Sequence, residues 1–300
     1  MGSVTKRRRF WLQEKFLRLQ KFLYSTHINR YQTYLRCLDL KGNRLRELLD
    51  KGEPTLGTRF LIPWPGVIEI IGYTGVFDYV EFVSEYAPFT LHDLDNFARA
   101  AELVNISTMI KIDQDPRTFL AERALAAGIQ NILFADIRSV EDAEAVVRAV
   151  RTEPRGINGV RVSRGVNYLF PPTTVKDVVK VCKDAVIAIM VERKSAVENL
   201  EEILSVDGID MVQFGPADYS VSIGVPGEKN HPKVQEAEIK TIKTALKMDV
   251  RPRAEIRRPE DAEKYIKLGV RDFSLNTDIR ILYGWLKENG ERLRKTISNI

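Results

Sequence analysis

The order of its apolar segments is the feature that most constrains how this chain can fold. From Lys41 onward, short apolar runs alternate with longer amphipathic segments, and little irregular sequence separates them. Short apolar runs bounded by turn residues are typical of buried strands, whereas i, i+3, i+4 spacing is typical of helices. Eight runs have strand character: residues 58–62, 79–83, 108–112, 131–135, 185–192, 211–214, 251–256 and 272–275.

The intervening segments predict helices over residues 91–104, 119–127, 140–151, 175–183, 195–204, 234–247 and 259–268. Several end at a glycine (Gly128, Gly208 and Gly269), where a helix favours a residue in the left-handed conformation. Eight strand–helix units within about 250 residues favour a closed (β/α)₈ barrel over an open sheet. We therefore predict an α/β fold, with a TIM-barrel domain over residues 41–300.

Two acidic residues follow two consecutive strands of this pattern. Glu192 ends the run at 185–192, and Asp218 follows the run at 211–214 through the turn Gly215-Pro216-Ala217. A helix between the strands makes them parallel, so both carboxylates emerge at the carboxyl end of the sheet, where barrels bind ligands. Acidic residues also cap helices or face solvent at such places. Two hard oxygen ligands without His or Cys suit Mg²⁺ or Mn²⁺.

Composition and motifs narrow the class of protein. The chain is 44% hydrophobic and 29% charged, as is usual for a globular protein, and its apolar runs are too short to span a membrane. Cys37 and Cys182 lie far apart without metal-binding spacing, so we expect a reducing, cytoplasmic environment. No glycine-rich phosphate loop, HExxH or GxSxG motif is present, so the sequence gives no support for the enzyme classes that these motifs characterise.

Residues 1–40 form a basic N-terminal extension. Residues 1–38 contain nine Lys or Arg and one acid, whereas the rest of the chain has 37 basic and 40 acidic groups. The net charge of +5 therefore comes from this extension and predicts no nucleic-acid binding by the barrel. Its apolar stripe suggests a basic amphipathic helix that contacts a membrane, the barrel or a neighbouring subunit, or a leader outside the natural chain. It lacks the apolar core of a secretory signal peptide.

The longest connection between predicted strands contains residues 159–172. Long connections on a barrel often form lids or contact substrate, so we expect this role here. Arg164 lies within this segment and is the cation that we expect to bind substrate.

Several motifs in this order resemble the metal-dependent 2-oxo-acid aldolases of the HpcH/HpaI aldolase and citrate lyase superfamily. The resemblance extends from about residue 43 to about residue 282 and is nearest to the 4-hydroxy-2-oxoheptanedioate and 2-dehydro-3-deoxyglucarate aldolases. The motifs are KGEPTLGT (51–58), AAGIQ (126–130), PRGING (154–159), VERKSAVEN (191–199), FGPADYS (214–220) and HPKVQ (231–235).

This resemblance implies a barrel, often in a hexamer with swapped C-terminal helices. It implies a divalent metal, Mg²⁺ or Mn²⁺ with Co²⁺ as a further candidate, on Glu192 and Asp218. A 2-oxo acid would chelate that metal, with its carboxylate near the backbone of Gly215, Ala217 and Asp218 and with Pro216 shaping the turn. Such a metal stabilises the enolate left by carbon–carbon cleavage.

The sequence departs from the family at three strand ends. The arginine expected over the enolate on the third strand is Lys111, which lacks the bidentate fork of arginine. In the Asp-x-Glu-His run after the second strand, Val83 and Tyr86 replace the Asp and His, and Glu85 is kept. Met190 replaces a glutamine two residues before Glu192. We therefore interpret Lys111, Tyr86 and Glu85 as the catalytic residues.

Tyr86 and His92 are the candidates for the general base. Tyrosine, with an ordinary pKa near 10, is a poor base. His92 follows near a helix start and is a candidate substitute, although a histidine there is more often a capping or surface residue.

Three functions fit these observations. The leading hypothesis is a metal-dependent carbon–carbon lyase that acts on a small 2-oxo acid through the enolate of pyruvate. Decarboxylation of an oxaloacetate-like acid is an alternative, because it needs no base for a hydroxyl proton. A repurposed barrel that binds metal and ligand without turnover is the third possibility. The resemblance also implies a homo-oligomer.

Overall fold

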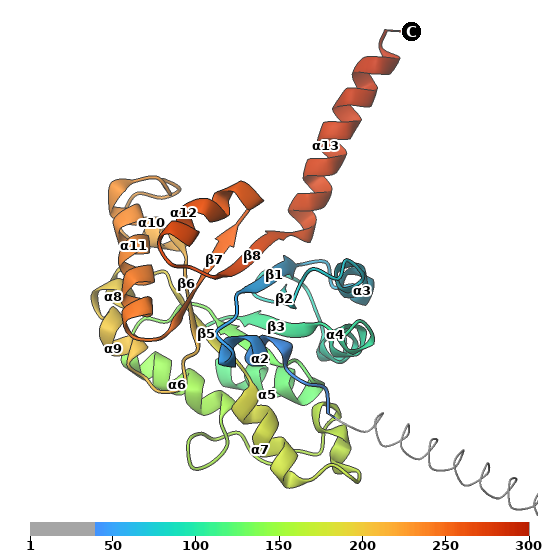
Figure 1. Ribbon diagram of the computed structural model, residues 1–300, viewed down its shortest axis with the longest axis vertical. Helices are drawn as coiled ribbons and strands as arrows, with labels where there is room; N and C mark the ends of the chain where they lie inside the picture. The colour runs from blue at the N-terminus through green and yellow to red at the C-terminus, as the bar shows by residue number, and fades with distance from the viewer. Residues whose placement is uncertain (1–39, 300) are drawn as a thin grey trace, which may run out of the picture.

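The predicted (β/α)₈ barrel is confirmed. The computed structural model describes residues 40–299, so the predicted features of residues 1–38 lie outside the described part. The parallel strands close into a barrel in chain order (Figure 1). They are β1 (Thr55–Phe60), β2 (Tyr79–Val83), β3 (Ser107–Ile112), β4 (Asn131–Phe134), β5 (Ile187–Val191), β6 (Met211–Phe214), β7 (Arg251–Ile256) and β8 (Asp272–Thr277).

The helices that cover the barrel agree largely with the predicted ranges, except that α3 lies outside them. They are α3 (Pro65–Tyr73), α4 (Leu91–Leu103), α5 (Arg117–Ala127), α6 (Val140–Val150), α8 (Lys194–Glu198), α9 (Leu200–Leu204), α11 (Pro232–Lys247), η2 (Pro259–Asp261) and α12 (Ala262–Lys267). The predicted helix at 195–204 is divided at Asn199 into α8 and α9. Gly128, Gly208 and Gly269 have positive φ angles of 101°, 106° and 96°, as the helix-end pattern predicts.

Strand β1 begins and ends earlier than residues 58–62, the predicted range. The amides of Leu61 and Ile62 leave the sheet because they donate to the Asp278 carboxylate, at 3.0 Å to Oδ1 and 2.9 Å to Oδ2 respectively. Asp278 begins α13 (Asp278–Ile297), which lies outside the predicted helices and projects away from the barrel in Figure 1. In residues 40–299, no helix is both long and apolar enough to cross a membrane.

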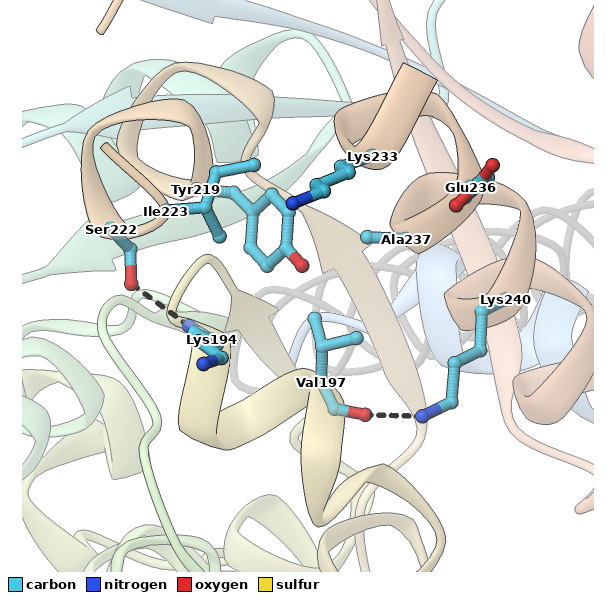
Figure 2. A pocket seen from close by; sticks show the side chains of 9 residues that line it. All are labelled: Lys194, Val197, Tyr219, Ser222, Ile223, Lys233, Glu236, Ala237 and Lys240. Carbon is cyan, nitrogen blue, oxygen red and sulfur yellow. Dashed lines mark hydrogen bonds between the residues drawn. The ribbon is translucent and has the colours of Figure 1, made fainter. Parts of the chain in front are cut away.

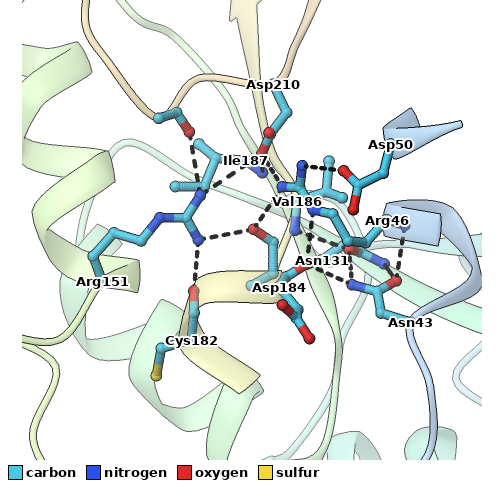
Figure 3. Close-up of polar contacts among 12 residues, drawn as sticks. Asn43, Arg46, Asp50, Asn131, Arg151, Cys182, Asp184, Val186, Ile187 and Asp210 are labelled. Atoms are coloured by element: carbon cyan, nitrogen blue, oxygen red, sulfur yellow. Dashed lines mark hydrogen bonds and ion pairs between the residues drawn. The ribbon is translucent and has the colours of Figure 1, made fainter. Parts of the chain in front are cut away.

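A short helix, α2 (Arg44–Asp50), closes the end of the barrel at which the strands begin. Its Leu45 is fully buried against interior side chains that include Met109 and Met211. Polar contacts fix the helix there: Asn43 Nδ2 donates to Asn131 Oδ1 at 2.8 Å, and Arg46 pairs with Asp210 at 2.6 Å (Figure 3). This end of the barrel is therefore filled, and any ligand site must lie at the other end.

The long connection lies at the closed end, and the prediction that it forms a lid is wrong. It follows α6, which has already returned to the end where the strands begin, and it leads through η1 (Arg164–Leu169) into the extra helix α7 (Val175–Asp184). Arg164 donates to the carbonyl of Ala127 at 2.9 Å and pairs with Glu102 at 2.5 Å. Both partners lie in the last turn of a covering helix, so this connection packs on the outside of the barrel.

Candidate active site at the carboxyl ends of the strands

A large cavity opens at the end of the barrel where the strands finish. Its volume is about 1140 Å³, and residues of several strands and of the loops after them line it. Sequence-predicted site residues meet in its wall: Tyr86, Lys111, Glu192, Gly215, Pro216, Ala217 and Asp218. The structure therefore brings together the two acidic residues and the cation that the sequence singled out.

Glu192 follows β5 directly and is held by the neighbouring strand end. Its side chain is buried, and its Oε1 accepts the backbone N–H of Asp136 at 2.8 Å. Asp136 has φ of 54°, a left-handed conformation that aspartate tolerates better than most residues. Burial raises the pKa of the Glu192 carboxyl above its ordinary value, while Lys111 and the Asp136 amide oppose this shift. Nearby Asp218 acts in the same direction as burial, as expected for two carboxylates in one cavity.

The turn between β6 and the short helix α10 (Pro216–Ser222) carries Asp218 towards the same cavity. Gly215 binds the end of β5 through its N–H, which donates to the carbonyl of Val191 at 3.0 Å. A Cβ atom on Gly215 would lie 2.5 Å from Glu192 Oε2 and 2.7 Å from Glu192 Cβ. The glycine therefore makes room for the Glu192 carboxylate, and Pro216 starts the helix that holds Asp218 in its first turn.

Lys111 belongs to β3 and faces the cavity between Glu85 and Tyr86. Its ammonium forms an ion pair with Glu85 and lies 3.5 Å from the Tyr86 hydroxyl. Burial acts to lower the pKa of Lys111, but Glu85 outweighs it, so the pKa lies above its ordinary value. The ring of Tyr86 is largely exposed, yet burial of its hydroxyl raises the pKa of Tyr86 to about 12. Lys111 is thus a fixed cation and Tyr86 a proton donor.

Comparison with known proteins decides the family. Residues 66–276 match the family described as HpcH/HpaI aldolase/citrate lyase. The chain belongs to this family. It is 33% identical over 219 residues to a 2-keto-3-deoxy-L-rhamnonate aldolase of Escherichia coli K12, covering 69% of this chain and 78% of that protein. It is 28% identical over 260 residues to a hydroxypyruvate/pyruvate aldolase of Delftia acidovorans, covering 86% and 95% of the two chains.

Solved structures of other proteins have the same fold. The crystal structure of an HpcH/HpaI aldolase from Desulfitobacterium hafniense DCB-2 is 25% identical, with a TM-score of 0.78 over 84% of this chain and 97% of that chain. A citrate synthase structure at 22% identity, with a TM-score of 0.77, has a similar fold over 86% of this chain.

This HpcH/HpaI chain contains a charged cluster in the barrel interior that the sequence analysis missed. Arg253 of β7 is fully buried and pairs with Glu81, while its other nitrogens donate to Tyr79 and Gln213, each at 2.7 Å. Burial opposes ionisation, but Glu81 raises the pKa of Arg253 above its ordinary value. Gln213 lies beside Met190 in the register of β5 and β6, and Met190 is the residue for which the resemblance led us to expect a glutamine.

A second ion pair lies nearer to the carboxyl ends of the strands, in the wall of the cavity. Arg59 of β1 and Glu255 of β7 are joined at 2.6 Å between Nη1 and Oε2. The sequence contained a signal for both ion pairs, because the charged residues Arg251, Arg253 and Glu255 alternate with apolar residues along β7. Alternate residues of a strand share one face, so this pattern places charge inside a barrel rather than on its helix-covered side.

Two other candidates lie elsewhere. Arg164 binds the outside of the closed end, so its expected role at the substrate is not supported by its place in this chain. His92 is exposed in the first turn of α4, and it is absent from the cavity wall.

The donor set at Glu192 and Asp218 fits a divalent cation. Both side chains supply hard oxygens, and the space left by Gly215 keeps the Glu192 carboxylate free of a clash. Within residues 40–299, no group of three or more His, Cys, Asp or Glu side chains is arranged to hold a metal. A cation here would therefore have two protein ligands and keep positions open for substrate and water, as Mg²⁺ commonly does.

Proposed function

We propose that this protein is a divalent-metal-dependent carbon–carbon lyase that acts on a small 2-oxo acid. The observation that carries this proposal is the presence of Glu192, Asp218 and buried Lys111 in the wall of one cavity at the carboxyl ends of the strands. The names of the relatives from Delftia acidovorans and Escherichia coli support this class of substrate, because both are aldolases of 2-oxo acids.

Glu192 and Asp218 would hold the cation, with Mg²⁺ and Mn²⁺ as the first candidates and Co²⁺ as a further one. When bound, the cation supplies Lewis-acid stabilisation of the negative charge that develops on the 2-oxo oxygen. The Asp136 amide orients Glu192, and Gly215 leaves the backbone of the turn accessible to the substrate carboxylate. The Asp136 amide fixes the Glu192 carboxylate before any ligand arrives, which reduces the reorganisation needed on binding.

Lys111 would add a second positive charge to the reacting centre. Its ion pair with Glu85 holds the ammonium against β2, and burial strengthens its field on a developing anion. Because its charge is shared with Glu85, Lys111 gives weaker stabilisation than an unpaired cation would. The Tyr86 hydroxyl stays protonated at neutral pH, so it would donate a hydrogen bond or a proton rather than accept one.

The protonated Tyr86 favours decarboxylation as the second candidate. Aldol cleavage requires a base for the proton of the 4-hydroxyl group, whereas loss of CO₂ from an oxaloacetate-like acid requires none. With a pKa of about 12, Tyr86 is not that base near neutral pH. Aldol cleavage in this cavity would depend on an ordered water or on one of the acidic residues.

We also propose that the protein is a homo-oligomer assembled through α13. This helix is exposed along its length, and large apolar side chains recur on it at Ile279, Leu282, Leu286 and Leu293. The spacing places them on one face of the helix, which a monomer would leave in water. A second copy of the chain, as in the hexamers that the family resemblance implies, would cover this face.

The decisive assay compares substrates on a single Mn²⁺-loaded preparation of the full chain. Pyruvate release is measured for a panel of 4-hydroxy-2-oxo acids and for oxaloacetate, before and after EDTA. We expect turnover that EDTA removes and that Glu192→Gln or Asp218→Asn reduces strongly. The matched variant Glu198→Gln, at an exposed position of α8, should retain it. No turnover of any 2-oxo acid, or turnover that survives both EDTA and Glu192→Gln, would refute the proposal.

A further inference from the structure

A second cavity lies outside the barrel, between α8, α10 and α11 (Figure 2). Its volume is about 440 Å³, within the range of small-molecule sites. None of its lining residues also lines the cavity at the strand ends. The two cavities use different faces of α11, so a ligand in one would not occupy the other.

The floor of this cavity is apolar and buried. Val197, Tyr219 and Ala237 form it, and each is less than 10% exposed, at 6%, 7% and 5%. Figure 2 shows the ring of Tyr219 between Val197 and α11, with its hydroxyl directed into the cavity. Such a floor would contact the apolar body of a ligand, and the tyrosine hydroxyl could accept or donate a hydrogen bond.

The rim is cationic. Lys194, Lys233 and Lys240 surround the floor, and Glu236 is the acidic residue in the lining. The Lys240 ammonium is fixed by the carbonyl of Val197 at 2.7 Å. The Lys233 ammonium makes no hydrogen bond or ion pair within the part of the chain that the structure describes, and Figure 2 shows it directed towards the Tyr219 ring. The Lys194 ammonium pairs with Glu198 at 3.6 Å, so Lys233 and Lys240 are the cations that face a ligand, and these two ammonium groups beside a buried aromatic floor favour an anionic head group.

The cavity wall is continuous with the two segments that carry the acidic residues of the barrel mouth. Lys194 lies two residues after Glu192, and Tyr219 directly follows Asp218. The backbone N–H of Lys194 donates to the Ser222 hydroxyl at 2.9 Å, which joins the loop after β5 to α10. This bond keeps the walls of the cavity together, so the site is built into the fold rather than formed by mobile surface lysines alone.

We propose that this cavity is a second ligand site, which binds a small organic anion with an apolar body and a phosphate or carboxylate head group. The apolar body lies on Val197, Tyr219 and Ala237, and the head group contacts Lys233 and Lys240 at the rim. The proposal does not depend on the chemistry at the barrel mouth.

The test is calorimetric titration of the full chain with phenyl phosphate, benzoate, inorganic phosphate and phenol. Phenyl phosphate combines an aromatic ring with a dianion, so we expect it to bind more tightly than inorganic phosphate or phenol, which each lack one part. Lys233→Met should weaken it about tenfold or more, the effect of losing a charge-assisted hydrogen bond. Lys243→Met removes an equivalent charge from α11 outside the cavity and should change the affinity less than twofold.

A second variant separates this site from the barrel mouth. Ala237→Leu fills the floor and should abolish phenyl phosphate binding, whereas Glu192→Gln should leave it unchanged. Binding that is lost in Glu192→Gln, that is equal in the Lys233 and Lys243 variants, or that is absent in the original chain would overturn the proposal. Tighter binding of phenyl phosphate than of benzoate would identify phosphate as the head group, and the reverse order would identify a carboxylate.

Discussion

Lys111 is the residue whose chemistry distinguishes this barrel from the pattern it resembles. It stands where the family resemblance leads us to expect an arginine; its side chain is buried, and it shares its charge with Glu85. We predict that Lys111→Met lowers kcat by about 10²–10³-fold, the effect of removing one group that stabilises developing negative charge. Steady-state rates on Mn²⁺-loaded protein measure this effect.

The control for this prediction restores the charge balance. Lys111→Met alone leaves the Glu85 carboxylate without its partner, so part of any loss could come from an altered structure. The double variant Lys111→Met/Glu85→Gln removes both charges and should recover stability without recovering the rate. Recovery of full activity in the double variant would show that Lys111 only neutralises Glu85.

Gly215 supplies the second prediction at this scale. A Cβ atom there would approach Glu192 Oε2 to 2.5 Å and Glu192 Cβ to 2.7 Å, so Glu192 must move. Gly215→Ala should therefore weaken Mn²⁺ binding about 10–100-fold, as when a residue that orients a metal ligand is lost. Electron paramagnetic resonance of free Mn²⁺ measures the affinity. Gly159→Ala, which has no atom within 4 Å of the added group, should leave it unchanged.

At the scale of elements, periodicity predicted what depends on local sequence. The alternation of apolar runs and amphipathic segments identified all eight strands, and the strand ends brought Glu192, Asp218 and Lys111 to one cavity. The early end of β1 was not predictable from its own residues. The backbone amides of Leu61 and Ile62, which follow the strand, donate to the carboxylate of Asp278, far away in the sequence.

The misplaced connection has a related cause. Its length suggested a lid, but the end of the barrel at which a connection lies depends on whether it precedes or follows the covering helix. Because α6 comes first, Arg164 reaches the closed end, where Glu102 pairs with it. The charge alternation of β7, by contrast, is visible in the sequence, so the interior cluster could have been predicted from it although it was missed.

Helix α13 gives the prediction for elements. Its exposed apolar face should bury itself against another copy, so the full chain should sediment as an oligomer rather than as a 34.3 kDa monomer. Leu286→Glu places a charge on that face and should shift the protein towards the monomer. Lys287→Glu changes the charge of the adjacent exposed position and serves as the control. Equal sedimentation of both variants and the original chain would exclude α13 as the interface.

For the whole molecule, the barrel interior combines packing with buried charge. The Arg253–Glu81 pair is almost inaccessible to solvent, so removing one partner leaves a buried charge without compensation. Arg253→Met should lower the free energy of unfolding by about 3–5 kcal/mol. Arg258→Met, which breaks an exposed pair with Asp261, should cost less than about 1 kcal/mol. Denaturant unfolding measures both, and equal losses would contradict the importance of the interior cluster.

The central claim is that this cavity stabilises negative charge on a 2-oxo acid, and exchange of the methyl protons of pyruvate for deuterium tests it most directly. This reaction needs no acceptor aldehyde and no base for a 4-hydroxyl proton, so it is independent of the physiological substrate. The methyl proton passes to an ordered water or to one of the acidic residues of the cavity, and deuterium from the solvent replaces it. The proton NMR signal of the pyruvate methyl group is followed in D₂O with Mg²⁺-loaded full chain. We predict exchange much faster than with Mg²⁺ alone, lost on adding EDTA and strongly reduced in Glu192→Gln. Exchange no faster than with the metal ion alone would contradict this account.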